Sequence, residues 1–168
     1  VHGLAGMSDS FAISRWLIGS LDAVDYPALL TYAVTVVTLS VLIVRQARQW
    51  NLLAVGEAWA ATRGAAVSRL MFAGYLSGSL LAATTVALTG PIGFIGLVVP
   101  HVLRRLLGSD HRLLVPASAL GGAAFVVGCD TLARLLPNAL PVGVVTALLG
   151  APFFLFLLVR EKGRASLW

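Results

Sequence analysis

Charged residues are scarce in this chain. Asp, Glu, Lys and Arg make up 11% of its 168 residues, whereas hydrophobic residues make up 58% and the mean hydropathy is +0.91. A soluble domain usually carries about a quarter of its residues as charged side chains. This scarcity excludes an ordinary soluble domain and predicts a protein that lies in a lipid bilayer.

Cysteine and the common catalytic motifs are also nearly absent. The single Cys129 stands inside an apolar run, which excludes an internal disulfide and a cysteine-rich metal site and predicts a small buried residue. The sequence has no phosphate loop of the GxxxxGK[ST] type, no paired carboxylates and no nucleophile–base pair. We therefore expect no catalytic residue, metal or cofactor in this chain, and the energy for any transport would come from a partner or a gradient.

Long apolar runs fill most of the sequence instead. Crossing a hydrocarbon core takes roughly 20 residues of helix. Four runs reach that length, at about 27–44, 70–89, 113–136 and 141–159. The chain is predicted to be an all-α, polytopic membrane helix bundle, and a fifth, shorter run brings the expected number of transmembrane helices to about five.

The fifth run, at about 91–107, is interrupted. Gly90, Gly93, Gly96 and Pro100 weaken a plain helix there. Such breaks survive in lipid only where protein or water satisfies the backbone groups. We therefore expect this segment to be packed inside the protein.

Basic residues give the orientation, because Lys and Arg accumulate in cytoplasmic loops. If the run 27–44 ends on the cytoplasmic side, Arg15 and Arg134 are the only basic residues on the opposite side of the membrane. The inside segments then hold Arg45, Arg48, Arg63, Arg69, Arg104, Arg105, Arg112, Arg160, Lys162 and Arg164. This predicts a cytoplasmic C-terminus. The net charge of +5 forms no basic face with interleaved aromatics, so nucleic acid is not an expected partner.

The longest polar connection, residues 45–69, faces the cytoplasm in this orientation. Within it, NLLAVGEAWAATRG predicts a short helix capped by Asn51. Gly56, Ala60 and Gly64 recur every four residues and predict a nearly bare helix face, against which another protein could press closely. An amphipathic helix lying on the membrane is the alternative that this composition leaves open.

Two ionisable groups stand near the outer end of the run 113–136. Asp130 and Arg134 have the spacing and order of a favourable helical ion pair. Because arginine has five N–H donors and one carboxylate rarely uses all of them, Arg134 could also bind an external carboxylate. A purely structural pair is the alternative.

A histidine follows the proline of the interrupted run. His101 could be a proton relay, a ligand or a packed imidazole with a backbone partner, and Arg104 lies one turn further on. A lone histidine is usually the packed kind. No second His, Cys or carboxylate stands within a turn, so a metal site has little support.

Several motifs together resemble the FecCD-type permeases of iron-siderophore, haem and vitamin B12 ABC importers. They are RWLIGSL at 15–21, LLAVGEAWAATRG at 52–64, GPIGFIGLVVPHVLRRLLGSDHRLLVPASALGGA at 90–123, CDTLARL at 129–135 and LPVGVVTALLGAPFFLFLLVR at 140–160. The resemblance implies the second half of a ten-helix permease, and we interpret the Val1 start as that of a fragment. The sequence around Ala139 departs from the Glu-Leu-Pro of many relatives.

The resemblance also implies roles for particular residues. The segment 45–69 matches the cytoplasmic coupling region that seats on the ATP-hydrolysing subunit, with Gly56, Glu57, Ala60, Thr62 and Gly64 as its coupling residues. Arg134, held by Asp130, matches an arginine that receives an acidic residue of the periplasmic or lipid-anchored substrate-binding protein. Gly93, Gly96, Pro100, His101 and Arg104 are expected to pack or gate the broken helix.

A second permease subunit and the lipid bilayer complete the expected partners. The expected function is translocation of an iron-siderophore complex, or of haem or cobalamin, across the cytoplasmic membrane. Two alternatives remain: a secondary transporter driven by an ion gradient, and a non-transporting membrane anchor or assembly fragment.

Overall fold

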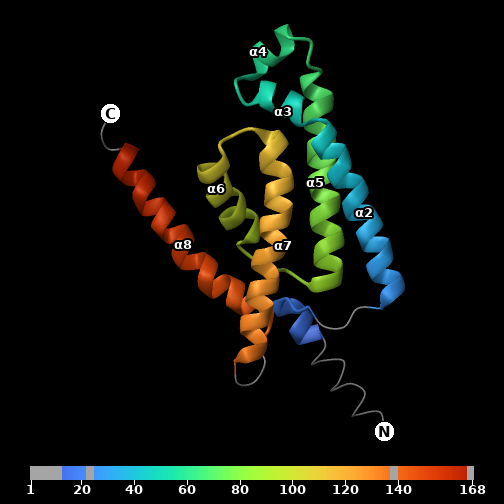
Figure 1. The fold of residues 1–168 in the computed structure, drawn as a ribbon, viewed down its shortest axis with the longest axis vertical. Helices are drawn as coiled ribbons and strands as arrows, with labels where there is room; N and C mark the ends of the chain where they lie inside the picture. The colour runs from blue at the N-terminus through green and yellow to red at the C-terminus, as the bar shows by residue number, and fades with distance from the viewer. Residues whose placement is uncertain (1–12, 22–24, 137–139, 166–168) are drawn as a thin grey trace. The chain divides into compact units, whose positions relative to one another are not determined.

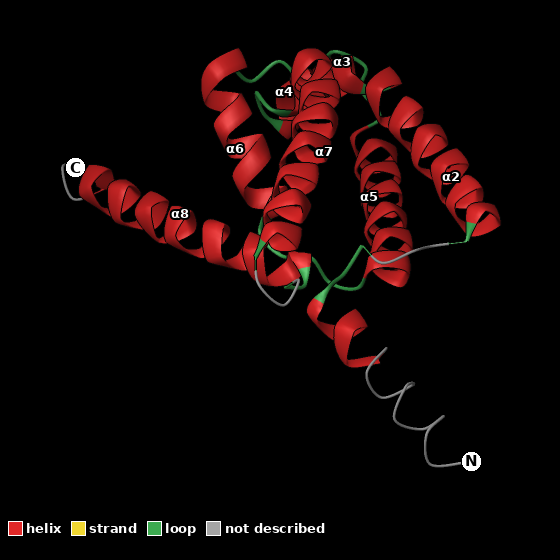
Figure 2. Ribbon diagram, turned by 60° about the horizontal axis from the view of Figure 1, so that its bottom comes forward, coloured by secondary structure: helices red, strands yellow, loops and turns green. Residues whose placement is uncertain are grey.

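The computed structural model describes residues 13–21, 25–136 and 140–165, and helices dominate this part of the chain, with no strand in it (Figures 1 and 2). A helical segment at 13–18 comes first. It is followed by α2 (Tyr26–Arg45), α3 (Ala47–Leu53), α4 (Glu57–Thr62), α5 (Val67–Thr89), α6 (Ile95–Leu107), α7 (His111–Leu135) and α8 (Val142–Ala165). The all-helical prediction is confirmed. The departure around Ala139 lies outside the described residues.

Three helices of the described part are long and apolar enough to cross a membrane, namely α2, α5 and α7. They coincide with three of the four long apolar runs. The fourth run forms α8, whose described apolar stretch is Val142–Leu157. The interrupted run forms α6, whose 13 residues reach only about 20 Å at 1.5 Å per residue.

The start of α6 differs from the expectation of a packed broken helix. Residues 90–94 are not helical, and Phe94, directly before α6, has a positive φ of 68°. Pro100 lies inside α6, which continues through it. Within this chain Val99 is buried, whereas Leu97 and Leu106 are exposed, so the expectation that the segment is packed inside the protein stays a prediction. The breaks are concentrated before α6, so its own backbone stays largely hydrogen-bonded.

The chain divides into two compact units, each with its own packing. The first comprises Val1–Asp22, Thr89–His101 and Gly121–Trp168. Its core contains Cys129, Ala133, Val142 and Val145, with Leu21, Ile92 and Phe125 packed against them. The prediction that Cys129 is a small buried residue is confirmed.

Close backbone approach holds the first unit together around the end of the segment 13–18. The Gly143 N–H donates to the Gly19 carbonyl at 3.1 Å. A Cβ at Gly143 would overlap the carbonyl oxygen of Ile18, and one at Gly90 would overlap that of Trp16. Glycine is therefore required at both positions for the chain to pass this closely.

The second unit comprises Ala23–Leu88 and Val102–Leu120. In it, α2 and α5 run side by side, and α3 and α4 lie beyond their shared end (Figure 1). The Tyr32 hydroxyl and Thr85 Oγ1 are 3.2 Å apart across α2 and α5. Ala47, Ala60, Leu70 and Leu114 are buried in this unit.

Candidate functional site: a helical connection and two outlying groups

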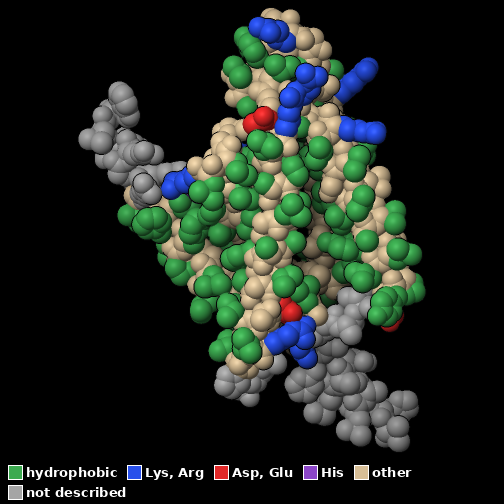
Figure 3. All heavy atoms as spheres, viewed as in Figure 1, with side chains coloured by type: hydrophobic (Ala, Val, Ile, Leu, Met, Phe, Trp, Pro, Cys, Tyr) green, Lys and Arg blue, Asp and Glu red, His purple; other side chains and the backbone are tan. Residues whose placement is uncertain are grey.

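The connection between α2 and α5 folds into two short helices. Arg45 ends α2, α3 follows after Gln46, and α4 begins after Gly56. Basic side chains gather around α3 and α4, whereas hydrophobic side chains line the length of α2 (Figure 3). The connection is therefore a compact polar element at the end of two apolar helices.

Two details of this element differ from the sequence-based expectation. Asn51 does not cap a helix but lies within α3, and Gly56 is the N-cap of α4. Ala60 is completely buried, with its carbonyl accepting from the backbone N–H groups of Arg63 and Ala65. The predicted bare face of three small residues is therefore wrong, because Ala60 points inward where the predicted face would have pointed outward.

Gly56 and Gly64 bracket α4 with left-handed backbone. Their φ angles are 149° and 81°, and a Cβ at either would meet no atom within 4 Å. Side chains other than glycine are strained at such angles. The two glycines thus shape the turns before and after α4 and leave open space beside the backbone at both.

The outer face of α4 is polar and aromatic. Glu57, Trp59, Thr62 and Arg63 are exposed. The Arg63 guanidinium lies over the Trp59 ring at 4.6 Å from its centroid, a cation–π contact. The Thr62 hydroxyl donates to the Trp59 carbonyl at 2.8 Å. The exposed Trp59 ring is thus covered on one face by Arg63, and its backbone carbonyl is bonded to Thr62.

A cluster of hydrogen bonds ties α3 to the beginning of α7. Asn51 Nδ2 donates to Asp110 Oδ1 at 2.6 Å, and the His111 backbone N–H donates to Asn51 Oδ1 at 2.8 Å. His111 Nδ1 lies 2.7 Å from the same oxygen. The Arg112 backbone N–H donates to Asp110 Oδ1 at 2.9 Å. The helix α3 and the loop before α7 are thus in direct contact.

The carboxyl group of Asp110 is stabilised in its charged form. The hydrogen bond from Asn51 is the main cause that lowers the pKa of Asp110, followed by the bond from the Arg112 backbone N–H. Arg112 and His111 lower it further through their charge. Asp110 is therefore an ionised acceptor at neutral pH.

At the far end of α7, the predicted ion pair is present. Arg134 Nε donates to Asp130 Oδ2 at 2.7 Å, and the Arg134 side chain is 64% exposed against 24% for Asp130. Arg134 also reaches the Leu21 carbonyl, at 3.5 Å. The pair holds the guanidinium in an orientation that leaves most of its surface open to solvent.

The residues predicted to pack the broken helix do not form one site. Gly93 and Gly96 are exposed, and a Cβ at either would meet nothing within 4 Å, so neither is a close-packing position within this chain. His101 contacts Phe153 edge-on at 6.4 Å between ring centroids, and its buried Nε2 has no hydrogen-bond partner among the described residues. It is a packed imidazole, but without a partner at Nε2. Arg104 is exposed near the end of α6.

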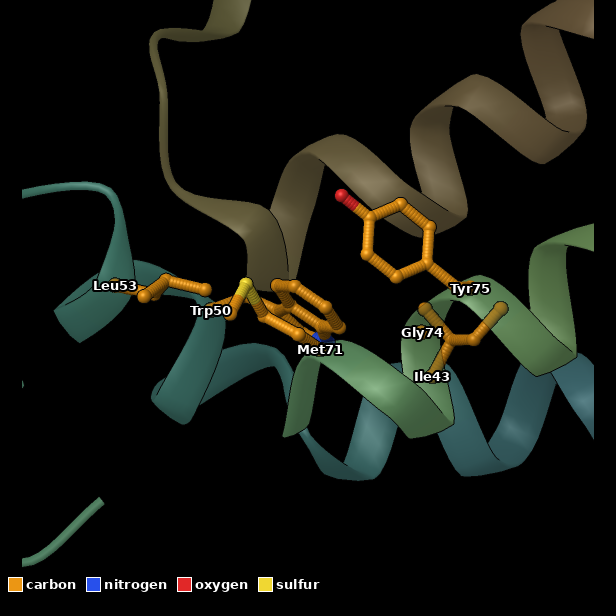
Figure 4. Close-up of a pocket in the computed structure, with 6 residues that line it drawn as sticks. All are labelled: Ile43, Trp50, Leu53, Met71, Gly74 and Tyr75. Carbon is orange, nitrogen blue, oxygen red and sulfur yellow. The ribbon is translucent and has the colours of Figure 1, made fainter. Parts of the chain in front are cut away.

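A half-open pocket lies between α3 and the neighbouring ends of α2 and α5. Its volume is about 370 Å³, and it is lined by Ile43, Trp50, Leu53, Met71, Gly74 and Tyr75 (Figure 4). Trp50 Nε1 is buried without a partner in the described part of the chain. The pocket is the place where the connection between α2 and α5 packs against α5.

Sequence reasoning missed two residues that the structure makes prominent. Asn51 bridges two connections that are far apart in the sequence, and no local pattern signals such a bridge. Phe94 adopts a left-handed backbone and packs its ring where a Cβ on Gly150 would lie. The signal for Phe94 was its position between glycines in a run that otherwise favours helix.

Comparison with known proteins gives the family. A model of the FecCD transport family matches residues 4–160. The chain therefore belongs to the FecCD transport family, as the motifs of the sequence indicated.

Three curated relatives are named as permease proteins of transport or import systems. The chain is 43% identical to the hemin transport system permease protein HmuU of Yersinia pestis, over 91% of this chain and 46% of that protein. It is 43% identical to the cobalamin import system permease protein BtuC of Halobacterium salinarum, over 89% and 41%. It is 41% identical to the Fe(3+) dicitrate transport system permease protein FecD of Escherichia coli, over 94% and 53%.

A solved structure has the same fold. It is described as an inward-facing conformation of a metal-chelate type ABC transporter, and it matches with a TM-score of 0.79 and 35% identity over 89% of this chain and 49% of that one. The chain spans about half the length of the curated relatives it matches.

Proposed function

We propose that this chain is the C-terminal half of the permease subunit of an ATP-binding-cassette importer in the cytoplasmic membrane. The observation that carries the proposal is the element α3–α4, a folded polar connection with an exposed aromatic and acidic face bracketed by Gly56 and Gly64. Family membership and the transport names of the relatives support it. A bare anchor would have no need of such an element.

In this proposal the element α3–α4 is the coupling segment, residues 45–69, which seats on a separate ATPase subunit. Gly56, Glu57, Thr62 and Gly64 lie on its accessible side, whereas the buried Ala60 supports the turn from within. ATP binding by the partner moves this segment, and the permease alternates between outward and inward states. Each partner stabilises one state more than the other, which is the thermodynamic requirement for such coupling.

The outer partner is proposed to be a substrate-binding protein. Arg134, positioned by Asp130 and 64% exposed, is a suitable contact for an acidic side chain of that protein. This assignment places the N-terminal end of α7 and the C-terminus of the chain in the cytoplasm. A second permease subunit would complete the pathway.

The proposed cargo is an intact ferric siderophore complex. The relatives named for hemin, cobalamin, ferric dicitrate and ferric hydroxamate import suggest a bulky metal chelate as the common cargo. Two of these relatives are named for ferric complexes, dicitrate and hydroxamate, and they favour a ferric siderophore as the cargo. The cargo crosses the membrane without a chemical change. The permease therefore provides only the pathway and the change between its outward and inward states.

The test uses the full-length permease co-expressed with the ATPase and binding protein encoded beside it. Glu57→Arg reverses the charge on the exposed face of α4, and Gly64→Trp fills the space next to it. Both should abolish copurification of the ATPase and uptake of ferric siderophore. Asp25→Arg, a charge reversal at an exposed position before α2 and outside residues 45–69, is the matched control for binding of the ATPase. Normal copurification and uptake in both α4 variants would contradict the coupling assignment.

A further inference from the structure

Asn51, in the coupling segment, makes side-chain hydrogen bonds to residues that are far away in the sequence. Its amide bonds to Asp110 and to His111, which are 59 and 60 residues away in the sequence. The partners belong to the connection before α7, in the same compact unit. A single side chain therefore joins the coupling segment to the start of a membrane-spanning helix.

The donors and acceptors of this cluster are matched. Asn51 Nδ2 donates to an ionised carboxylate, which fixes the amide orientation and leaves Oδ1 as the acceptor for the His111 backbone N–H. Since Oδ1 can only accept, His111 Nδ1 carries the proton in the contact at 2.7 Å. Both the neutral Nδ1–H tautomer and the imidazolium donate from this nitrogen. The cluster therefore does not depend on the charge of His111.

Asp110 also caps α7. Its Oδ1 accepts the Arg112 backbone N–H, and its backbone carbonyl accepts from Leu113 and Leu114. This is the way a helix N-cap satisfies the first backbone donors. Asn51 therefore contacts the capping group of α7 itself, so displacement of α3 pulls on the first turn of that helix.

We propose that Asn51 is the positioning residue that transmits motion of the coupling segment to the inner end of α7. The inference rests on the proposed function, since it names the path by which that segment acts. Its physical basis is a chain of three short hydrogen bonds. Two of them have the Asp110 carboxylate as acceptor, and hydrogen bonds to a charged acceptor are stronger than neutral ones. Arg48 and Gln49 of α3 are exposed, whereas Trp50 and Leu53 line the apolar pocket.

The experiment compares three variants of the full-length permease, reconstituted with its ATPase and binding protein. Asn51→Asp places two carboxylates face to face and should lower the amount transported per ATP hydrolysed by about fivefold or more, with the ATPase still bound. Asp110→Asn keeps an acceptor and a capping group, so it should stay within about twofold of wild type. In the Asn51→Asp/Asp110→Asn double variant, the donor and acceptor are exchanged, and transport per ATP should return.

Ser109→Asp is the control, because it adds a carboxylate to the exposed loop before α7, outside the coupling segment. It should leave the transport per ATP unchanged. A merely structural role for Asn51 predicts lower yield or stability at constant transport per ATP, and that result would overturn the inference. So would a folded double variant that stays uncoupled. If the wild-type permease binds no ATPase at all, the proposed function itself fails.

Discussion

Gly74 on α5 lies directly against the indole ring of Trp50 on α3. A Cβ added at Gly74 would overlap the ring carbons, whereas one added at Gly78, a turn further along α5, would meet no atom within 4 Å. The absence of a side chain at Gly74 therefore allows α3 to pack closely onto α5. Small residues at such positions let helices approach closely.

Replacing Gly74 should loosen this junction. Gly74→Ala forces the indole to move, and overpacking of this kind costs about 1–3 kcal/mol. The purified permease should melt at a lower temperature and lose binding of the ATPase in parallel. Gly78→Ala is the matched control and should change neither property. Equal melting temperatures and equal ATPase binding in the two variants would show that the contact with Trp50 does not contribute to stability.

The exposed guanidinium of Arg134 leads to a prediction on docking. Arg134→Glu should slow association of the binding protein and raise its dissociation constant by about tenfold at low salt, because rim charges act mainly through association. The loss should shrink as salt is added. Arg134→Lys should retain much of the affinity. Binding kinetics on the reconstituted permease at two salt concentrations measure this, and an unaltered constant for Arg134→Glu would leave only a structural ion pair.

Asp130→Asn tests the support of that arginine separately. It removes the charge partner at 2.7 Å and leaves the Arg134 charge in place. Docking should weaken by less than in Arg134→Glu, since the guanidinium is still present but less well oriented. The reverse order of effects would assign the contact with the binding protein to Asp130.

The helices of this fold follow directly from the sequence. Apolar runs at about 27–44, 70–89 and 113–136 became α2, α5 and α7. In lipid a run of this length has few alternatives to a helix, since every backbone group must find a partner within the segment. Length and hydropathy decide the outcome there, so the prediction needed no knowledge of tertiary contacts.

The candidate site was less predictable, because its geometry depends on contacts between distant segments. The four-residue repeat of Gly56, Ala60 and Gly64 suggested one bare face, yet Ala60 is buried because the chain turns at both glycines. Asn51 looked like a cap from its neighbours and instead bonds to Asp110. A four-residue spacing places residues on one face only if they belong to the same helix. Here α4 spans Glu57–Thr62, so Gly56 and Gly64 lie outside it.

The single cysteine offers a simple check of the first unit. Cys129 is 2% exposed in the core around Val142 and Val145. We expect no reaction with a maleimide in the native permease and full reaction after denaturation, because access limits thiol chemistry. Ser109→Cys, in an exposed loop, is the positive control. Rapid labelling of Cys129 in the native protein would contradict the packing of this core.

The lowered pKa of Asp110 gives a prediction on pH. Because the folded-state pKa of Asp110 is depressed below the ordinary value of an aspartate, the contribution of this carboxylate to stability is present above the unfolded-state pKa. It is lost as the pH falls through the folded-state pKa. The bond to Asn51 should therefore stay intact from about pH 5 to 8. Infrared or NMR titration of isotope-labelled aspartate should find one carboxyl group that ionises below the ordinary range, and Asn51→Ala should raise its pKa, since the main cause of the shift is removed. A titration unchanged by Asn51→Ala would mean that the amide does not hold Asp110, and the link between α3 and α7 would then lose its charged member.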